Sequence, residues 1–137
     1  MRYLALDLGD RRIGVAISDT LGMLARPLEV FARTSRVADF EHVGQLVAQH
    51  QAEALVVGLP LSMDGSESQQ TAWVRDYSAA LTETLTVPLH LWDERLTTEE
   101  AASIMRAQGK APTKDWIDAV AAAVILQSYL DNLGSRV

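Results

Sequence analysis

The chain has 137 residues and a mass of 15.0 kDa, with 48% apolar residues and a formal net charge of −6. This length and composition fit one folded domain with a substantial core, and they exclude a disordered chain or a disulfide-stapled mini-protein. Cysteine is absent, which excludes disulfide bonds and thiolate metal sites, and no apolar run approaches the length of a membrane span. We therefore expect a soluble cytoplasmic protein.

The N-terminal half predicts three consecutive strands, then a helix and a buried strand. Two apolar runs within residues 3–19 flank a short Gly/Asp/Arg segment, which is typical of a β-hairpin. A third strand is expected over residues 24–33, at the edge of the sheet because Pro27 cannot donate a backbone hydrogen bond. Apolar residues spaced by three and four indicate a helix over residues 37–51. The continuous apolar run at 54–60 predicts a strand buried on both faces, with parallel neighbours.

The C-terminal half alternates helices with one more strand. We expect a helix over residues 68–85, a strand over 88–94, a helix over 97–109 that begins with a Thr-Thr-Glu-Glu capping box, and a final helix over 114–133. Three strands followed by this alternation predict an α/β fold, a five-stranded mixed sheet with the first strand central and helices on both faces. One domain over residues 1–137 accounts for every element.

Three acidic residues fall where they could meet at one end of this sheet. Asp7 occupies the last pleat of the first strand, at the edge where open α/β sheets bind ligands. Glu94 ends the last strand, and Asp118 lies early in the last helix, on a face lined by small alanine side chains. Asp93 is the alternative to Glu94, because adjacent strand residues point to opposite faces and only one of them can face Asp7.

Carboxylates that converge in this way favour a divalent metal ion. Ionised carboxylates a few ångströms apart repel one another, and the usual relief is a hard cation bound through oxygen. Mg²⁺ or Mn²⁺ fits, because cysteine is absent and the three histidines have no spacing suited to zinc. A pair of such ions can promote in-line displacement at a phosphoryl group, which is nuclease chemistry.

Positive charge gathers near the segments that carry these acids. Residues 1–36 hold six arginines against four acidic residues, whereas residues 37–94 hold one arginine against nine acidic residues. The acidic middle segment is therefore expected to face away from a polyanion. The candidates to bind flanking phosphates are Arg11, Arg12 and Arg95, which adjoin the acids, and Lys110 and Lys114 on a predicted loop.

Motifs spread over the whole chain carry a resemblance to a known family. They are Asp7-Leu8-Gly9, Arg12-Ile13-Gly14-Val15-Ala16, Gly58-Leu59-Pro60, Asp93-Glu94-Arg95-Leu96-Thr97-Thr98, and Asp118 followed by Ala121-Ala122. In this order and spacing the chain resembles the YqgF/RuvX family, relatives of the RuvC Holliday-junction resolvase in the RNase H-like superfamily. The resemblance implies an RNase H-like fold, catalytic and metal-binding acids at Asp7, Glu94 and Asp118, and phosphodiester hydrolysis dependent on Mg²⁺ or Mn²⁺. It also implies maturation of the 5′ end of pre-16S rRNA, with RNA favoured over branched DNA and ribosomal precursor particles as partners.

Several alternatives stay open from the sequence alone. Resolution of a Holliday junction would require two active sites and hence a symmetric dimer, whereas RNA processing suits a monomer or a homodimer. A non-catalytic RNA-binding factor for ribosome assembly or transcription would keep the fold with vestigial acids. An actin-like or sugar-kinase ATPase half would need a second lobe, which 137 residues do not supply. The strand that ends in Gly58-Leu59-Pro60 also lacks the acid that RuvC-like enzymes usually carry beside the first one.

Overall fold

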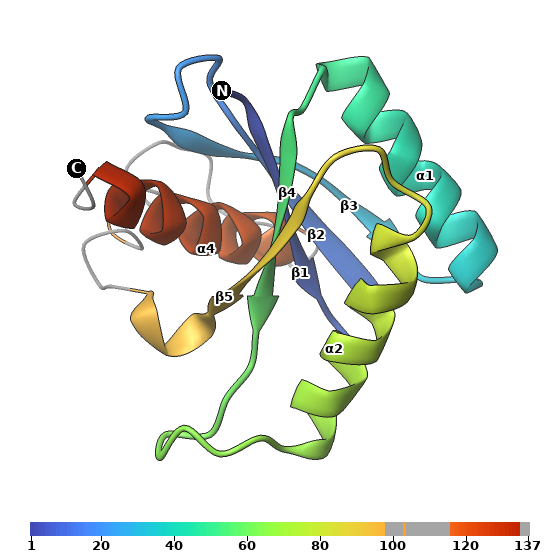
Figure 1. The fold of residues 1–137 in the computed structure, drawn as a ribbon, viewed down its shortest axis with the longest axis vertical. Coiled ribbons are helices and arrows are strands. Elements are labelled where there is room, and N and C mark those ends of the chain that lie inside the picture. Colours follow the sequence, from blue (N-terminus) through green and yellow to red (C-terminus); the bar gives the residue numbers. More distant parts are fainter. Residues whose placement is uncertain (98–102, 104–115, 135–137) are drawn as a thin grey trace.

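A computed structural model describes residues 1–97, 103 and 116–134, and within them five strands and three helices are seen. The strands are β1 (Tyr3–Leu8), β2 (Arg12–Ser18), β3 (Ala25–Ala32), β4 (Ala54–Leu59) and β5 (Leu89–Asp93). The helices are α1 (Arg36–His50), α2 (Gln69–Thr82) and α4 (Ile117–Gly134), and a short 3-10 helix, η1 (Glu94–Leu96), follows β5. Figure 1 shows the strands forming one twisted sheet between the helices.

The sheet has the strand order β3-β2-β1-β4-β5, which confirms that β1 is central and that β3 lies at an edge. β1 pairs antiparallel with β2 across a short turn, and it pairs parallel with β4 through the crossover that contains α1. β4 pairs parallel with β5 through the crossover that contains α2. The C-terminal ends of β1, β4 and β5 therefore meet at one edge of the sheet, which we call the C-terminal edge.

Different helices cover the two faces of the sheet, because side chains alternate along each strand. Leu4 and Leu6 of β1 pack into a core with residues of α1 and α2, on what we call the α2 face. Tyr3 and Ala5 pack against α4 on the opposite α4 face, which Asp7 shares. The prediction of a mixed sheet with helices on both faces is confirmed, and Figure 1 shows this layering.

Local capping explains where the first two helices begin. The side chain of Ser35 accepts a hydrogen bond from the amide of Ala38 at the start of α1. Ser68 and Thr71 form a reciprocal capping box at the start of α2. α2 ends at Thr82, earlier than the sequence predicted, because the chain turns there: the amides of Thr84 and Leu85 donate to the carbonyls of Leu81 and Thr82, and the Thr84 hydroxyl also donates to the Leu81 carbonyl.

α4 lies across β1, β2 and β3, and its buried alanines allow the helix to approach the sheet closely. The structure describes this helix from Ile117, so Asp118 lies in its first turn. The helix predicted over 97–109 and the loop predicted over 109–114 lie outside the described residues, apart from isolated positions. Within the part of the chain that is described, no helix is both long and apolar enough to cross a membrane.

Candidate active site

Asp7 lies near the C-terminal end of the central strand and points to the α4 face. Its partner across the antiparallel ladder is Gly14 of β2. Burial, together with the negative charge of Asp118, raises the pKa of the Asp7 carboxyl from 3.8 to about 6. A carboxylate in such surroundings is unfavourable when ionised, and a cation bound beside it would offset that cost.

Glu94 is the first residue of η1, directly after β5 ends. Its side chain extends back over β4. Position 58 in that strand is glycine, and a β-carbon added there would lie only 2.7 Å from Oε1 of Glu94. Because β4 is the neighbour of β1, the carboxylate comes alongside Asp7 although β5 is one strand further away. Burial, then the charges of Asp7 and Asp93, raise the pKa of Glu94 from 4.5 to about 7.

Asp7 and Glu94 line the same cleft, which has a volume of about 340 Å³. The other lining residues carry no charge, and they are Thr97, Ala121, Val124 and Ile125. Two partly buried carboxylates, whose pKa values are raised chiefly by burial, are hard oxygen donors, the ligand type that Mg²⁺ and Mn²⁺ prefer. The residues of this cleft therefore fit a divalent cation.

Asp118 stands beside this cleft, close enough to Asp7 to raise the pKa of that carboxyl. Its own carboxylate accepts a hydrogen bond from Nε of Arg12 at 3.0 Å, and it does not line the cleft. Within the described ranges, no group of three Asp, Glu or His side chains is placed to hold a metal ion together. The structure thus brings two of the predicted acids into one cleft and places the third next to them, in an ion pair.

Asp93, the alternative to Glu94, is engaged elsewhere. Its carboxylate accepts a hydrogen bond from the backbone N–H of Arg95 at 2.9 Å and pairs with the guanidinium of Arg95 at 2.7 Å. These bonds, of which the guanidinium contact is the stronger influence, lower the pKa of Asp93. Arg95 also donates to the carbonyl of Met63 at 3.4 Å, so it ties η1 to the loop before α2. The geometry favours Glu94 as the acid that faces Asp7.

The basic residues that the sequence offered as phosphate ligands have different surroundings. Arg12 and Arg95 each pair with one of the carboxylates described above, so they position acids within the protein. Arg11 is exposed in the turn after β1 and is open to a ligand from solvent. Lys110 and Lys114 lie outside the described residues.

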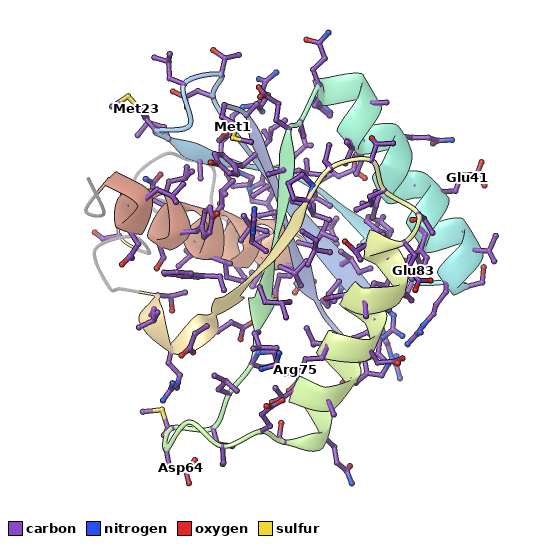
Figure 2. The ribbon with its side chains drawn as sticks, in the orientation of Figure 1. Met1, Met23, Glu41, Asp64, Arg75 and Glu83 are labelled. Carbon is purple, nitrogen blue, oxygen red and sulfur yellow. The ribbon has the colours of Figure 1, made fainter. Side chains whose placement is uncertain are left out.

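Two residues of the acidic middle segment lie on the side of the molecule away from the cleft. Figure 2 shows Glu41 projecting outward from α1 and places Glu83 at the end of α2, both on the side of the molecule away from η1 and α4. Both residues are exposed. Asp64 lies at the tip of the loop between β4 and α2 in the same view. Glu94 is the member of this segment that enters the cleft.

Two glycines that belong to the sequence motifs, but were not predicted as site residues, make room for the site. The bare backbone of Gly58 leaves the space that the Glu94 carboxylate occupies. At Gly14, a β-carbon would lie 1.9 Å from the carbonyl oxygen of Asp118, so the start of α4 touches the strand at the partner of Asp7. Glycine inside a strand pattern is a known signal of close backbone approach, and it could have identified both positions.

Comparison with known proteins gives relatives along almost the whole chain. A family model described as RuvX, Holliday junction resolvase, matches residues 1–132. A protein of Thermoanaerobacter pseudethanolicus is 41% identical over 135 residues, which cover 96% of this chain and 97% of the relative. A protein of Anaeromyxobacter sp. is 44% identical over 133 residues, which cover 96% of this chain and 97% of the relative. Both relatives are provisionally named pre-16S rRNA nuclease.

Solved structures share the fold at much lower sequence identity. RuvC of Thermus thermophilus, in complex with a Holliday junction substrate, superposes with a TM-score of 0.65 at 15% identity, over 98% of this chain and 97% of that one. The fowlpox virus resolvase, in complex with Holliday junction DNA, gives a TM-score of 0.58 at 9% identity, over 97% of this chain and 99% of that one. These likenesses confirm the predicted RNase H-like, RuvC-type fold.

Proposed function

The chain belongs to the RuvX family, described as Holliday junction resolvase, and from this premise we propose that it is a divalent-metal-dependent endonuclease that hydrolyses phosphodiester bonds in nucleic acid. The observation that carries the proposal is the cleft shared by Asp7 and Glu94, whose pKa values are raised to about 6 and about 7. Such a pair at the C-terminal edge of an α/β sheet is suited to bind Mg²⁺ or Mn²⁺.

Each acid has a role that follows from its position. Asp7 and Glu94 would hold the cation in the cleft. Asp118, at the start of α4, would add a third carboxylate beside them. Arg12 orients the Asp118 carboxylate from β2 through its Nε. When bound, the cation supplies Lewis-acid stabilisation of the negative charge that develops on the scissile phosphate. The apolar side chains of α4 that line the cleft limit the access of water to this charge.

The proposed substrate is RNA, with maturation of the 5′ end of pre-16S rRNA in cytoplasmic ribosomal precursor particles as the process. The names of the relatives at about 40% identity support this choice. Cleavage of branched DNA is the second candidate, supported by the description of the family. The RNA reaction needs one active site, so a monomer or a homodimer suffices, whereas junction resolution needs two sites in a symmetric dimer.

A cleavage assay on the purified protein tests the proposed function. A single-stranded pre-rRNA leader and a four-way DNA junction are incubated side by side with Mg²⁺, with Mn²⁺, and with EDTA. We expect metal-dependent cleavage of the leader and no cleavage in EDTA. Cleavage of the junction alone would reverse the order of substrates. Binding of the leader without cleavage in either metal would favour the non-catalytic RNA-binding alternative.

Replacing Gly58 by alanine is expected to slow cleavage by about 10- to 100-fold while the protein still folds. The added methyl would lie 2.6 Å from Cδ1 of Ile125 and 2.7 Å from Oε1 of Glu94. Both atoms are ends of flexible side chains and can move, so the carboxylate would be displaced from Asp7. A displacement of about 1 Å in an active site can cost on the order of 10²-fold in rate.

The matched control for this substitution is Gly44→Ala in α1, where nothing lies within 4 Å of the added carbon. Initial cleavage rates and thermal unfolding of both variants are the measurements. Cleavage by the Gly58 variant at the wild-type rate would contradict the placement of the Glu94 carboxylate over β4.

A further inference from the structure

A second cleft lies at the C-terminal edge, on the α2 face of the sheet and thus on the other side from Asp7. It has a volume of about 460 Å³, and its lining residues are Asp10, Arg33, Gln69, Gln70 and Trp73. Asp10 belongs to the turn between β1 and β2, and Arg33 follows β3 directly. The two glutamines and the tryptophan lie near the start of α2. None of these residues has a part in the catalytic cleft.

The guanidinium of Arg33 is held in a fixed position in this second cleft. Its Nη1 donates hydrogen bonds to the carbonyl oxygens of Gly9 at 3.0 Å and Asp10 at 2.8 Å. Its Cζ lies 4.3 Å from the centre of the Trp73 ring, and that ring packs on Tyr77 with centres 5.1 Å apart. Within the described part of the chain, Nε and Nη2 of Arg33 donate no hydrogen bond and remain open to a ligand.

The chemistry of the lining residues matches an unstacked nucleotide. Proteins commonly stack the bases of single-stranded nucleic acids on the guanidinium planes of arginine and on aromatic rings such as indole. The carboxamides of Gln69 and Gln70 are exposed at the cleft and offer both donors and acceptors to the edge of a base. The open donors of Arg33 suit a phosphate oxygen. In a duplex the faces of each base are covered by its neighbours, so the cleft fits a single strand.

The turn between β1 and β2 connects this cleft to the catalytic one. Asp10 follows Asp7 by three residues, and a fully extended stretch of that length spans at most about 11 Å. The turn is fixed by the bond from the Gly9 amide to the carbonyl of Arg12 at 3.0 Å, in addition to the two bonds from Arg33. A nucleic-acid strand that passes over the C-terminal end of β1 would therefore reach both clefts within a short stretch of nucleotides.

We propose that the second cleft binds one unstacked nucleotide of a single-stranded nucleic acid, close to the phosphate that lies at Asp7 and Glu94. The binding part of the proposal stands on the cleft itself, and the relation to the cleaved phosphate rests on the proposed nuclease function. The site would give the protein a preference for single strands over perfect duplexes, through stacking on the Arg33 guanidinium, which the Trp73 ring supports from its other side.

The test measures binding of a short unstructured single-stranded RNA in EDTA, which prevents metal-dependent cleavage. Fluorescence anisotropy of the labelled RNA gives the affinity, and the indole N–H signals of ¹⁵N-labelled protein report the place of binding. The chain has three tryptophans, and loss of one signal in Trp73→Phe assigns the relevant one. Single-stranded DNA and a duplex of the same sequence are the comparison ligands.

Two variants probe the cleft: one removes the glutamine carboxamides, and the other replaces the guanidinium on which a base would stack. We expect Gln69→Ala/Gln70→Ala to weaken binding of the single strand on the order of fivefold, because pairing with the base edge is lost. Arg33→Lys should weaken it about tenfold, because lysine keeps the charge but cannot stack or form a planar pair. Gln45→Ala/Gln49→Ala on the exposed side of α1 is the matched control, with unchanged affinity expected.

A shifted Trp73 signal with single-stranded RNA or DNA, and weaker binding in the cleft variants alone, are the results expected. An unshifted signal, equal losses in the control variant, or tighter binding of the duplex would overturn the proposal. The nuclease function is judged separately, by cleavage of the pre-rRNA leader and of the four-way junction in Mn²⁺. Binding at Trp73 without cleavage of either substrate would overturn only the nuclease, and cleavage with no change at Trp73 would overturn only the nucleotide cleft.

Discussion

Asp7→Asn is expected to abolish cleavage and at the same time to make the folded protein more stable. Loss of the carboxylate removes a proposed cation ligand, and several kcal/mol of lost transition-state stabilisation corresponds to a rate about 10³-fold lower. In the folded protein the ionised form of Asp7 is unfavourable, because its pKa is raised from 3.8 to about 6. That difference corresponds to about 3 kcal/mol near neutral pH, and we expect the neutral amide to recover about 2 kcal/mol of it.

The pH dependence of stability gives this prediction a sign that can be checked. Between about pH 4 and about pH 6 the folded protein keeps a proton on Asp7 that the unfolded chain has lost. The free energy of unfolding of the wild type therefore falls as the pH rises through this window, and Glu94 extends the fall to about pH 7. Urea unfolding in EDTA should show that the free energy of unfolding of Asp7→Asn, relative to that of the wild type, is higher at pH 7 than at pH 4. Parallel stability curves would contradict the burial of an ionisable Asp7.

The control for this pair of effects is Asp19→Asn at the opposite end of β2. The carboxylate of Asp19 accepts a hydrogen bond from the amide of Met23 at 2.7 Å, and this bond above all lowers its pKa. The sign is therefore reversed, since ionised Asp19 stabilises the fold and its loss should lower stability at neutral pH. Cleavage should not change. Inactivation by both substitutions would indicate a general effect on folding and not a role for Asp7.

Gly14→Ala is expected to have the largest effect on stability, a loss of about 3 kcal/mol or more. A β-carbon at this position would lie 1.9 Å from the carbonyl oxygen of Asp118 and 2.3 Å from its carbonyl carbon. Both atoms belong to the backbone, so no change of rotamer relieves the overlap and the start of α4 must move away from β2. Overpacking of this kind commonly costs about 1–3 kcal/mol, and a backbone clash lies at the upper end of that range.

Cleavage should be lost together with stability in this variant, because Gly14 pairs with Asp7 and lies under Asp118. Chemical unfolding and cleavage at a temperature where the variant is folded separate the two effects. Gly44→Ala is again the control, and it should stabilise the protein by up to about 1 kcal/mol because Gly44 is inside a helix with open space around it. Wild-type stability of the Gly14 variant would contradict the close approach of α4 to the sheet.

The parts of the fold that depend on local pattern could be predicted from the sequence. The alternation of side chains in β1 placed Asp7 on the face opposite Leu6, and Pro27 placed β3 at an edge. The continuous apolar run of β4 predicted its two parallel neighbours. These features follow from the residues of one segment at a time, and the structure confirms them.

The details of the site depend on contacts between distant segments, and the sequence could not show them. Arg12 adjoins the turn after Asp7 and looked like a phosphate ligand, but it pairs with Asp118, which is 106 residues away. Glu94 comes near Asp7 only because β4 carries no side chain at Gly58. This arrangement also shows how a chain without an acid on β4 still places a second carboxylate beside the first.

Diffraction at an energy where manganese scatters anomalously, from crystals of the wild type grown with Mn²⁺, tests the central claim most directly. We expect an anomalous peak in the cleft between the carboxylates of Asp7 and Glu94, and its loss in crystals of Asp7→Asn. An empty cleft in the wild type, with manganese bound only at other surface carboxylates, would contradict the assignment of this pair as the cation site.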